Sequence, residues 1–214
     1  MFGVLNLNLR SVENGGASTL KSLSNDGLST SRIGSRGLED LGDGLKAGFW
    51  LESAVLPDVG SSNATKFFNR RSTASIIDPR FGELRLGRDN VPTFTAIGVY
   101  EAFGTNGLSE VPGNGTGVGL VSTLGSGANT LTRADNQISY FLPALLGGMY
   151  GQLALAAGEG KVCDKVASGR IGFAAEPFGL SLSHAESRVA AGDQFKQTVL
   201  GGFYDFGVAK AMAQ

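Results

Sequence analysis

The chain has 214 residues, enough for one domain with a sizeable core or for two small ones. Its 18 Lys+Arg and 19 Asp+Glu residues give a net charge of −1, which argues against binding nucleic acid through bulk charge. Glycine is enriched at 33 residues, and because an interior glycine costs a helix about 1 kcal/mol, this content argues against a helical bundle.

Alternation with a period of two is the dominant pattern along the chain. In the segment 45–52 the odd positions are all apolar, from Leu45 to Leu51, and the even positions include Lys46, Trp50 and Glu52. Because a strand turns successive side chains to opposite faces, this segment is predicted to be a strand with one apolar and one mixed polar face.

The same pattern, separated by Gly, Pro and Asp turn signals, predicts about ten antiparallel strands and no helix. Most are about ten residues long, which fits a tilted membrane-crossing strand better than the usual five or six. The predicted strands cover residues 2–12, 29–38, 44–54, 66–77, 82–88, 132–142, 147–158, 168–176, 178–187 and 195–206, and a further strand is predicted from Val208.

The connections between these strands alternate between short and long. Those at 39–44 and 78–82 are short, the one at 56–65 is longer, and the one from Asp89 to about Leu131 is much longer still. A connection of that length with little periodicity is usually functional, so we predict that residues 89–131 form the functional loop.

Alternation alone leaves two folds open. A soluble β-sandwich turns its apolar face inward, whereas a membrane β-barrel turns it toward lipid and encloses a polar lumen. Long strands, alternating connections and aromatic residues near strand ends favour the barrel, since aromatics are typical of the two membrane interfaces. No run of about 18 apolar residues predicts a transmembrane helix.

Seven segments stand out as motifs, in this order: Thr30–Gly37, Glu39–Gly42, Gly44–Glu52, Phe68–Thr73, Phe81–Asp89, Asn136–Phe141 and Tyr204–Lys210. Together they resemble motifs of Gram-negative general porins, most closely the anion-selective porins of β-proteobacterial outer membranes. The resemblance is densest from Ser29 to Asp89 and from Arg133 to Phe141, and looser elsewhere.

The resemblance implies an all-β fold: a sixteen-stranded antiparallel transmembrane barrel, three of which form a homotrimer in the outer membrane. Residues 89–131 would be the loop that folds inward and narrows the lumen. Such a barrel needs roughly 300 residues, so the whole chain, 1–214, is expected to be a partial barrel. The family's signal peptide and closing aromatic strand are not found in it, and we therefore expect a fragment or a truncated product.

The resemblance also implies an arginine ladder at the narrowest part of the lumen, opposed by acidic or polar groups of the inward loop. Arg32 and Arg133 match the ladder arginines of their strands, and either Arg70 or Arg71 matches the third. Alternation favours Arg71 for the lumen. Further candidates on the wall are Arg36, Lys46, Arg85 and Arg88, and in the loop Glu101 and Glu110 are expected to offset part of the positive field.

These features predict a passive diffusion channel for small hydrophilic solutes and ions, with a preference for small anions. Guanidiniums in a narrow aqueous throat raise the local anion concentration and exclude cations. The predicted partners are these solutes, outer-membrane lipid and two further copies of the chain, with no nucleic acid. A soluble β-sandwich or surface adhesion module that only binds is the alternative from another class.

No catalytic, cofactor or metal site is predicted. The only cysteine, Cys163, allows neither an intrachain disulfide nor a thiolate metal cage, and it is interpreted as an incidental thiol. The only histidine, His184, has no Gly-x-Ser-x-Gly elbow to work with, so an enzyme inside a small barrel is the weakest hypothesis. Trp50 is expected to pack against lumen side chains rather than to bind a solute.

Overall fold

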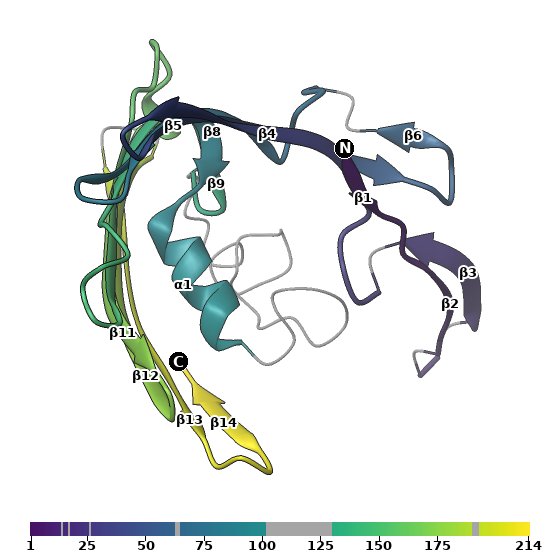
Figure 1. Ribbon diagram of the computed structural model, residues 1–214. Coiled ribbons are helices and arrows are strands. Elements are labelled where there is room, and N and C mark those ends of the chain that lie inside the picture. The colour runs from purple at the N-terminus through teal and green to yellow at the C-terminus, as the bar shows by residue number, and fades with distance from the viewer. Residues whose placement is uncertain (14, 17, 26, 63–64, 102–129, 190–192) are drawn as a thin grey trace.

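One curved antiparallel sheet dominates the computed structural model, which describes residues 1–13, 15–16, 18–25, 27–62, 65–101, 130–189 and 193–214. Its strands follow the order β1-β4-β5-β7-β8-β9-β10-β11-β12-β13-β14, with β6 paired to β5. The sheet is open, and β1 and β14 are its two edges (Figure 1).

From β4 on, each strand of this sheet pairs with the next one along the chain apart from the short β6, with short turns at one end and longer connections at the other. β1 instead pairs with β4, which comes later in the chain. Their bounds are β1 Phe2–Val4, β4 Arg32–Gly42, β5 Leu45–Leu56, β6 Ser61–Ser62, β7 Arg71–Asp78, β8 Gly82–Asn90, β9 Arg133–Phe141, β10 Met149–Ala156, β11 Val166–Ala175, β12 Phe178–Arg188, β13 Gln194–Asp205 and β14 Lys210–Ala213. Most of the predicted strands are therefore confirmed within a few residues.

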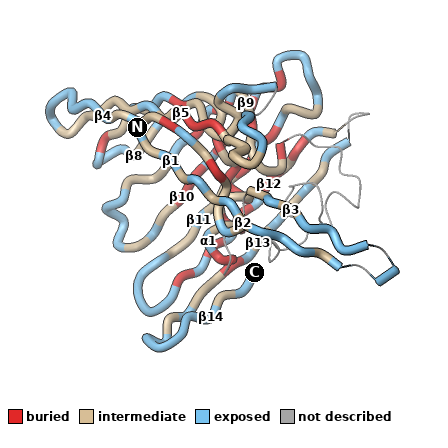
Figure 2. The backbone as a smooth tube through the Cα atoms, turned by 90° about the vertical axis from the view of Figure 1, so that its right-hand side faces the viewer, coloured by how far each residue is buried: buried red, intermediate tan, exposed pale blue. Residues whose placement is uncertain are grey.

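The two faces of the sheet carry opposite chemistry. On the convex face large apolar side chains are exposed, among them Phe49, Leu153 and Leu180. On the concave face the buried side chains are largely polar, for example Gln137, Ser181 and Ser183. Figure 2 shows the buried residues as short stretches within an otherwise intermediate or exposed chain. This arrangement contradicts the soluble sandwich, which would bury Phe49 in a core.

A single α-helix, α1 (Pro92–Tyr100), lies on the concave side of the sheet in the part of the chain that the structure describes (Figure 1). The prediction that the chain contains no helix was therefore wrong. The segment PTFTAIGVY is rich in β-branched and aromatic residues, which have weak helix propensity. Its buried residues are Pro92, Thr93, Ala96, Ile97 and Tyr100, a helical spacing, so packing against the wall stabilises the helix where propensity does not.

The N-terminal strand prediction, 2–12, was also wrong in part. The chain leaves the main sheet after β1, and β2 (Leu7–Val12) pairs with β3 (Leu20–Asn25) in a separate two-stranded sheet. β3 was not predicted. The Asn6 backbone N–H donates to Ser31 Oγ at 2.9 Å, which ties the break between β1 and β2 to the chain just before β4. The strand predicted at 66–77 begins only at Arg71.

Backbone irregularities in β8 and β9 interrupt the regular alternation of side chains between the two faces of the sheet. Gly87 has φ +121°, and a Cβ there would collide with the Ser72 carbonyl oxygen, so only glycine fits. The β8–β9 register shifts between Gly87 and Asp89, and Asn136 takes φ +53° on the opposite strand. Residues 133–139 therefore do not keep the single polar face that strict alternation predicts.

No helix among the described residues is long and apolar enough to cross a bilayer.

Candidate functional site

A cavity of about 730 Å³ lies between the concave face of the sheet and α1. β4, β5, β7 and β8 supply one side of it, and α1 supplies Phe94, Thr95, Gly98 and Val99. Thr132 and Arg133 join at the start of β9. The cavity therefore lies between the wall that carries most of the predicted arginines and the described beginning of the long connection.

Five of the eight basic residues predicted for the wall line this cavity. They are Arg32, Arg36, Arg70, Arg71 and Arg133. Arg70 and Arg71 both take part, although alternation favours only Arg71. The reason is that β7 begins at Arg71, so Arg70 precedes the strand and does not obey its period. Its backbone N–H donates to the Glu52 carbonyl at 3.2 Å.

The structure does not bring Arg88 or Lys46 into this group. Arg88 donates from Nη1 to Asp135 Oδ1 and from Nε to the Asn69 carbonyl, each at 2.7 Å. Asp135 also pairs with Lys66. Lys46 shares the face of Trp50, but it lies only two positions beyond the β4–β5 turn, opposite Asp40 and Ile77. Neither residue is among those that line the cavity, and a role for either at the constriction stays a prediction.

Glu52 is the buried carboxylate at one end of the cluster. Its Oε1 accepts from Arg70 Nε at 2.5 Å and lies 3.7 Å from Arg32 Nε, while Oε2 accepts from the Trp50 indole N–H at 2.9 Å. Arg32 is also held by Ser29 Oγ and the Thr30 carbonyl. One carboxylate therefore orders two guanidiniums and an indole.

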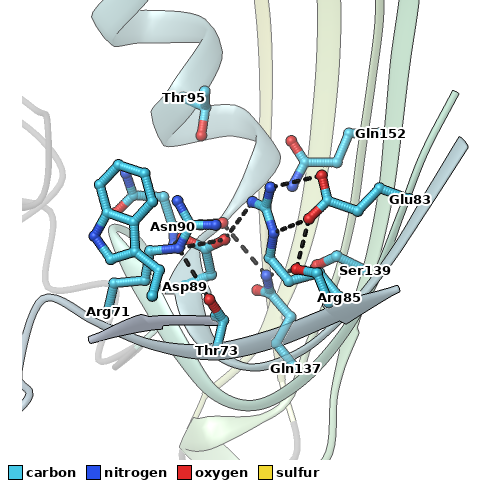
Figure 3. Close-up of polar contacts among 12 residues, drawn as sticks. Arg71, Thr73, Glu83, Arg85, Asp89, Asn90, Thr95, Gln137, Ser139 and Gln152 are labelled. Carbon is cyan, nitrogen blue, oxygen red and sulfur yellow. Dashed lines mark hydrogen bonds and ion pairs between the residues drawn. The ribbon is translucent and has the colours of Figure 1, made fainter. Parts of the chain in front are cut away.

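Asp89 is the carboxylate at the other end, and Figure 3 shows its surroundings. Its Oδ2 accepts from Arg85 Nη1 at 2.7 Å and lies 3.7 Å from Arg71 Nε. Arg85 is further bound by both carboxylate oxygens of Glu83, at 2.7 and 2.9 Å, and stacks 4.1 Å from the Phe141 ring centroid. Arg85 is thus fully engaged by carboxylates, whereas Arg71 is only loosely paired.

The charges around the cavity do not balance. In the part of the chain that the structure describes, five arginines line it against two carboxylates, Glu52 and Asp89. Among the described residues Arg36 and Arg133 form no ion pair with a carboxylate, and Arg133 Nε is buried without a hydrogen-bond partner. A buried unpartnered guanidinium N–H is costly, which makes it a ready donor to an incoming anion. Chemically, the cavity suits a small oxyanion or halide.

The end of α1 is seated on the opposite wall. The Tyr100 side chain is 2% exposed, its hydroxyl lies 2.9 Å from the Tyr150 hydroxyl, and its ring lies over Gly201. The Arg170 guanidinium lies 5.4 Å from the Tyr150 ring centroid and donates to Gln152 at 3.0 Å. These contacts fix how far α1 stands from the arginines.

The remaining singled-out residues lie elsewhere. His184 is exposed on β12 and its Nδ1 lies 2.7 Å from Thr198 Oγ1. Cys163 is a half-buried free thiol in the short turn Val162–Asp164. No group of three or more His, Cys, Asp or Glu suited to a metal occurs in the part of the chain that the structure describes. Glu101 is buried after α1, and Glu110 lies outside the described residues.

Sequence reasoning missed two components of the site: the acidic partner Glu52, and Arg170 with Tyr150 beneath α1. The expectation that Trp50 packs against neighbouring side chains of its face is confirmed by its contacts with Arg36 and Arg71. Glu52 and Trp50 share the mixed face of β5 with Lys46, so the signal was present in the alternation. Arg170 occupies a concave-facing position of β11, but nothing local to it indicates a contact with a helix 70 residues earlier.

Comparison with known sequences identifies one family. The profile of Gram-negative porins matches residues 1–214. The outer membrane porin protein 32 of Delftia acidovorans is 37% identical over 221 residues, covering 98% of this chain and 61% of the relative. An outer membrane porin protein of Bordetella pertussis is 31% identical over 205 residues, covering 84% of this chain and 50% of that relative.

Among solved structures, an anion-selective porin from Comamonas acidovorans superposes with a TM-score of 0.83 at 34% identity. The match covers 98% of this chain and 64% of the Comamonas chain. The chain thus spans less than two thirds of the length of each of these relatives.

Proposed function

The chain belongs to the Gram-negative porin family, and from this premise we propose that the protein is a passive diffusion channel of the outer membrane. It passes small hydrophilic solutes and ions without an energy source or a catalytic step. The opposite polarity of the two faces supports this, since exposed leucine and phenylalanine suit lipid while the polar concave face suits water. The full protein then closes as a sixteen-stranded barrel and assembles as a homotrimer. Of the predicted inward loop, residues 102–129 lie outside the described residues, and α1, near its beginning, narrows the lumen.

The channel prefers anions, and the surplus of arginine over carboxylate in the cavity is the observation that carries this proposal. Guanidiniums stay charged at any physiological pH, so the preference persists into alkaline solution. Their field concentrates anions in the narrow passage and excludes cations. Salt screens charges beyond about 8–10 Å at physiological ionic strength, so the preference weakens as salt rises.

Reversal potentials across planar bilayers test the proposal. The full-length protein, purified from outer membranes, is expected to give stepwise channels whose reversal potential in a KCl gradient has the sign of chloride selectivity. Arg71→Gln together with Arg133→Gln is expected to lower the chloride-to-potassium permeability ratio several-fold. Arg10→Gln, a matched substitution in the separate β2–β3 sheet, leaves the ratio unchanged. A wild-type preference for potassium refutes the proposal.

The trimer is tested separately. Protein in mild detergent is expected to run as a trimer on gels without heating and as a monomer after boiling. A monomer in both conditions refutes the assembly but leaves the conductance measurement to decide channel activity.

A further inference from the structure

Trp50 stands between two guanidiniums in the cavity. Arg36 Cζ lies 4.8 Å and Arg71 Cζ 4.5 Å from the centre of the indole. Arg36 is the β4 partner of Trp50 in the sheet register, and the β7 partner is Thr73, two residues after Arg71. The two arginines therefore reach the indole from the strands on either side of β5.

The indole itself is held in place at its edge. Its N–H donates to Glu52 Oε2 at 2.9 Å, and Phe2 meets it edge-on with ring centres 5.3 Å apart. The Phe2 ring also lies 5.5 Å from Arg36 Cζ. The ring is thus a fixed platform rather than a mobile side chain.

A ring contact and a carboxylate contact have different electrical consequences. A carboxylate cancels the charge of the guanidinium that it binds, whereas an aromatic face attracts the cation through its quadrupole and adds no net charge. Arg70 and Arg85 are bound to carboxylates at 2.5–2.9 Å. Arg71 Nε instead donates to Thr73 Oγ1 at 3.1 Å and forms only a long ion pair with Asp89, at 3.7 Å, while its guanidinium rests near the indole. Arg36 has ring contacts with Trp50 and Phe2.

We propose that Trp50 is a positioning residue for anion selectivity, which holds Arg36 and Arg71 in the passage without neutralising them. This inference rests on the proposed anion channel and deepens it. Held on the ring, each guanidinium keeps its terminal N–H groups available to a halide or a small oxyanion, although Arg71 Nε itself donates to Thr73. Without the ring, the Arg71 guanidinium moves closer to Asp89 and Arg36 is no longer held in position. The positive field in the passage then weakens, although no charged group has been removed.

Substitutions in the full-length channel test this in planar bilayers. Trp50→Leu is expected to lower the chloride-to-potassium permeability ratio at least about twofold, because both ring-held charges lose their position. Trp50→Phe keeps a ring face and is expected to retain most of the ratio. Phe173→Leu removes a ring that packs on Phe178 outside the cavity, and is the matched control. An unchanged ratio in Trp50→Leu overturns the proposal.

Two further measurements separate positioning from a merely structural role. In the Arg36→Gln, Arg71→Gln background, Trp50→Leu is expected to cause no further loss, whereas a structural defect would still lower the ratio. Trp50→Met, which also lacks a ring face, takes the place of Trp50→Leu should the leucine variant fail to assemble. Equal losses in Trp50→Phe and Trp50→Leu contradict the ring contact and assign the effect to the N–H bond with Glu52.

The two proposals fail in distinguishable ways. A wild-type channel without anion preference refutes the proposed function, whereas an anion-selective wild type with an equally selective Trp50→Leu variant refutes only the role of Trp50.

Discussion

Glu52 combines two opposing effects in one side chain. It stabilises the folded wall by binding Arg70 and the Trp50 indole, and it cancels part of the positive charge in the cavity. Glu52→Gln is therefore expected to raise the chloride-to-potassium ratio and to lower stability by about 1–3 kcal/mol, the cost of leaving a half-buried guanidinium poorly paired. Reversal potentials and urea unfolding in detergent measure the two effects. A fall in the chloride-to-potassium ratio contradicts the conclusion that Glu52 cancels positive charge in the cavity.

Asp78 shows a different kind of charge effect, at the β7–β8 turn. Hydrogen bonds from the Arg80 guanidinium and backbone N–H hold the pKa of Asp78 at about 2, below its ordinary 3.8. A carboxyl with a depressed folded pKa stabilises above its unfolded pKa and loses that contribution as pH falls through the folded value. The Asp78 contribution is thus fully present above about pH 4 and is lost between about pH 4 and 2.

Unfolding measured against pH tests this assignment. Asp78→Asn is expected to be less stable than wild type at neutral pH, and the difference is expected to disappear toward pH 2. Asp43→Asn, at the β4–β5 turn, is the matched control. A difference between wild type and Asp78→Asn that persists at pH 2 contradicts the pairing with Arg80.

At the scale of elements, the seat of α1 depends on a wall glycine. A Cβ at Gly201 would lie 2.8 Å from the Tyr100 ring, so Gly201→Ala displaces the end of α1 toward the arginines. We expect a smaller single-channel conductance and a destabilisation of about 1–3 kcal/mol from overpacking. Gly202→Ala places its methyl away from α1, 3.1 Å from the Gly179 carbonyl oxygen, and is the control. Equal conductance in both variants contradicts the role of Gly201 in placing the end of α1.

Local alternation predicts strands well but tertiary contacts poorly. The strands from β4 to β13 were predicted within a few residues, apart from the start of β7 and the short β6, which falls in a predicted connection. α1 was missed because its β-branched and aromatic residues favour a strand, and only packing of Thr93, Ile97 and Tyr100 on the wall makes it helical. Resemblance and alternation pointed to Arg71, whereas its contacts with Asp89 and Trp50 depend on register across strands, which one sequence does not reveal.

At the scale of the whole molecule, the apolar convex face of the sheet is the surface expected to contact lipid. Leu153 lies near the middle of β10 and is exposed there, so Leu153→Arg places a cation in the hydrocarbon. The expected cost is about 2–4 kcal/mol at the midplane and about 0–1 kcal/mol near the interface. Leu145→Arg, in the β9–β10 turn, is therefore the matched control. Unfolding in lipid vesicles measures both, and equal costs contradict a membrane-crossing β10.

The surplus of three positive charges around the cavity has a consequence for the protein as a bulk object. Because the chain as a whole carries −1, the residues outside the cavity carry −4. Ion-exchange chromatography or isoelectric focusing responds to the total charge and would group this chain of 214 residues with acidic proteins. A separation by overall charge therefore reports a negative net charge, whereas a permeating ion meets a positive charge inside the cavity.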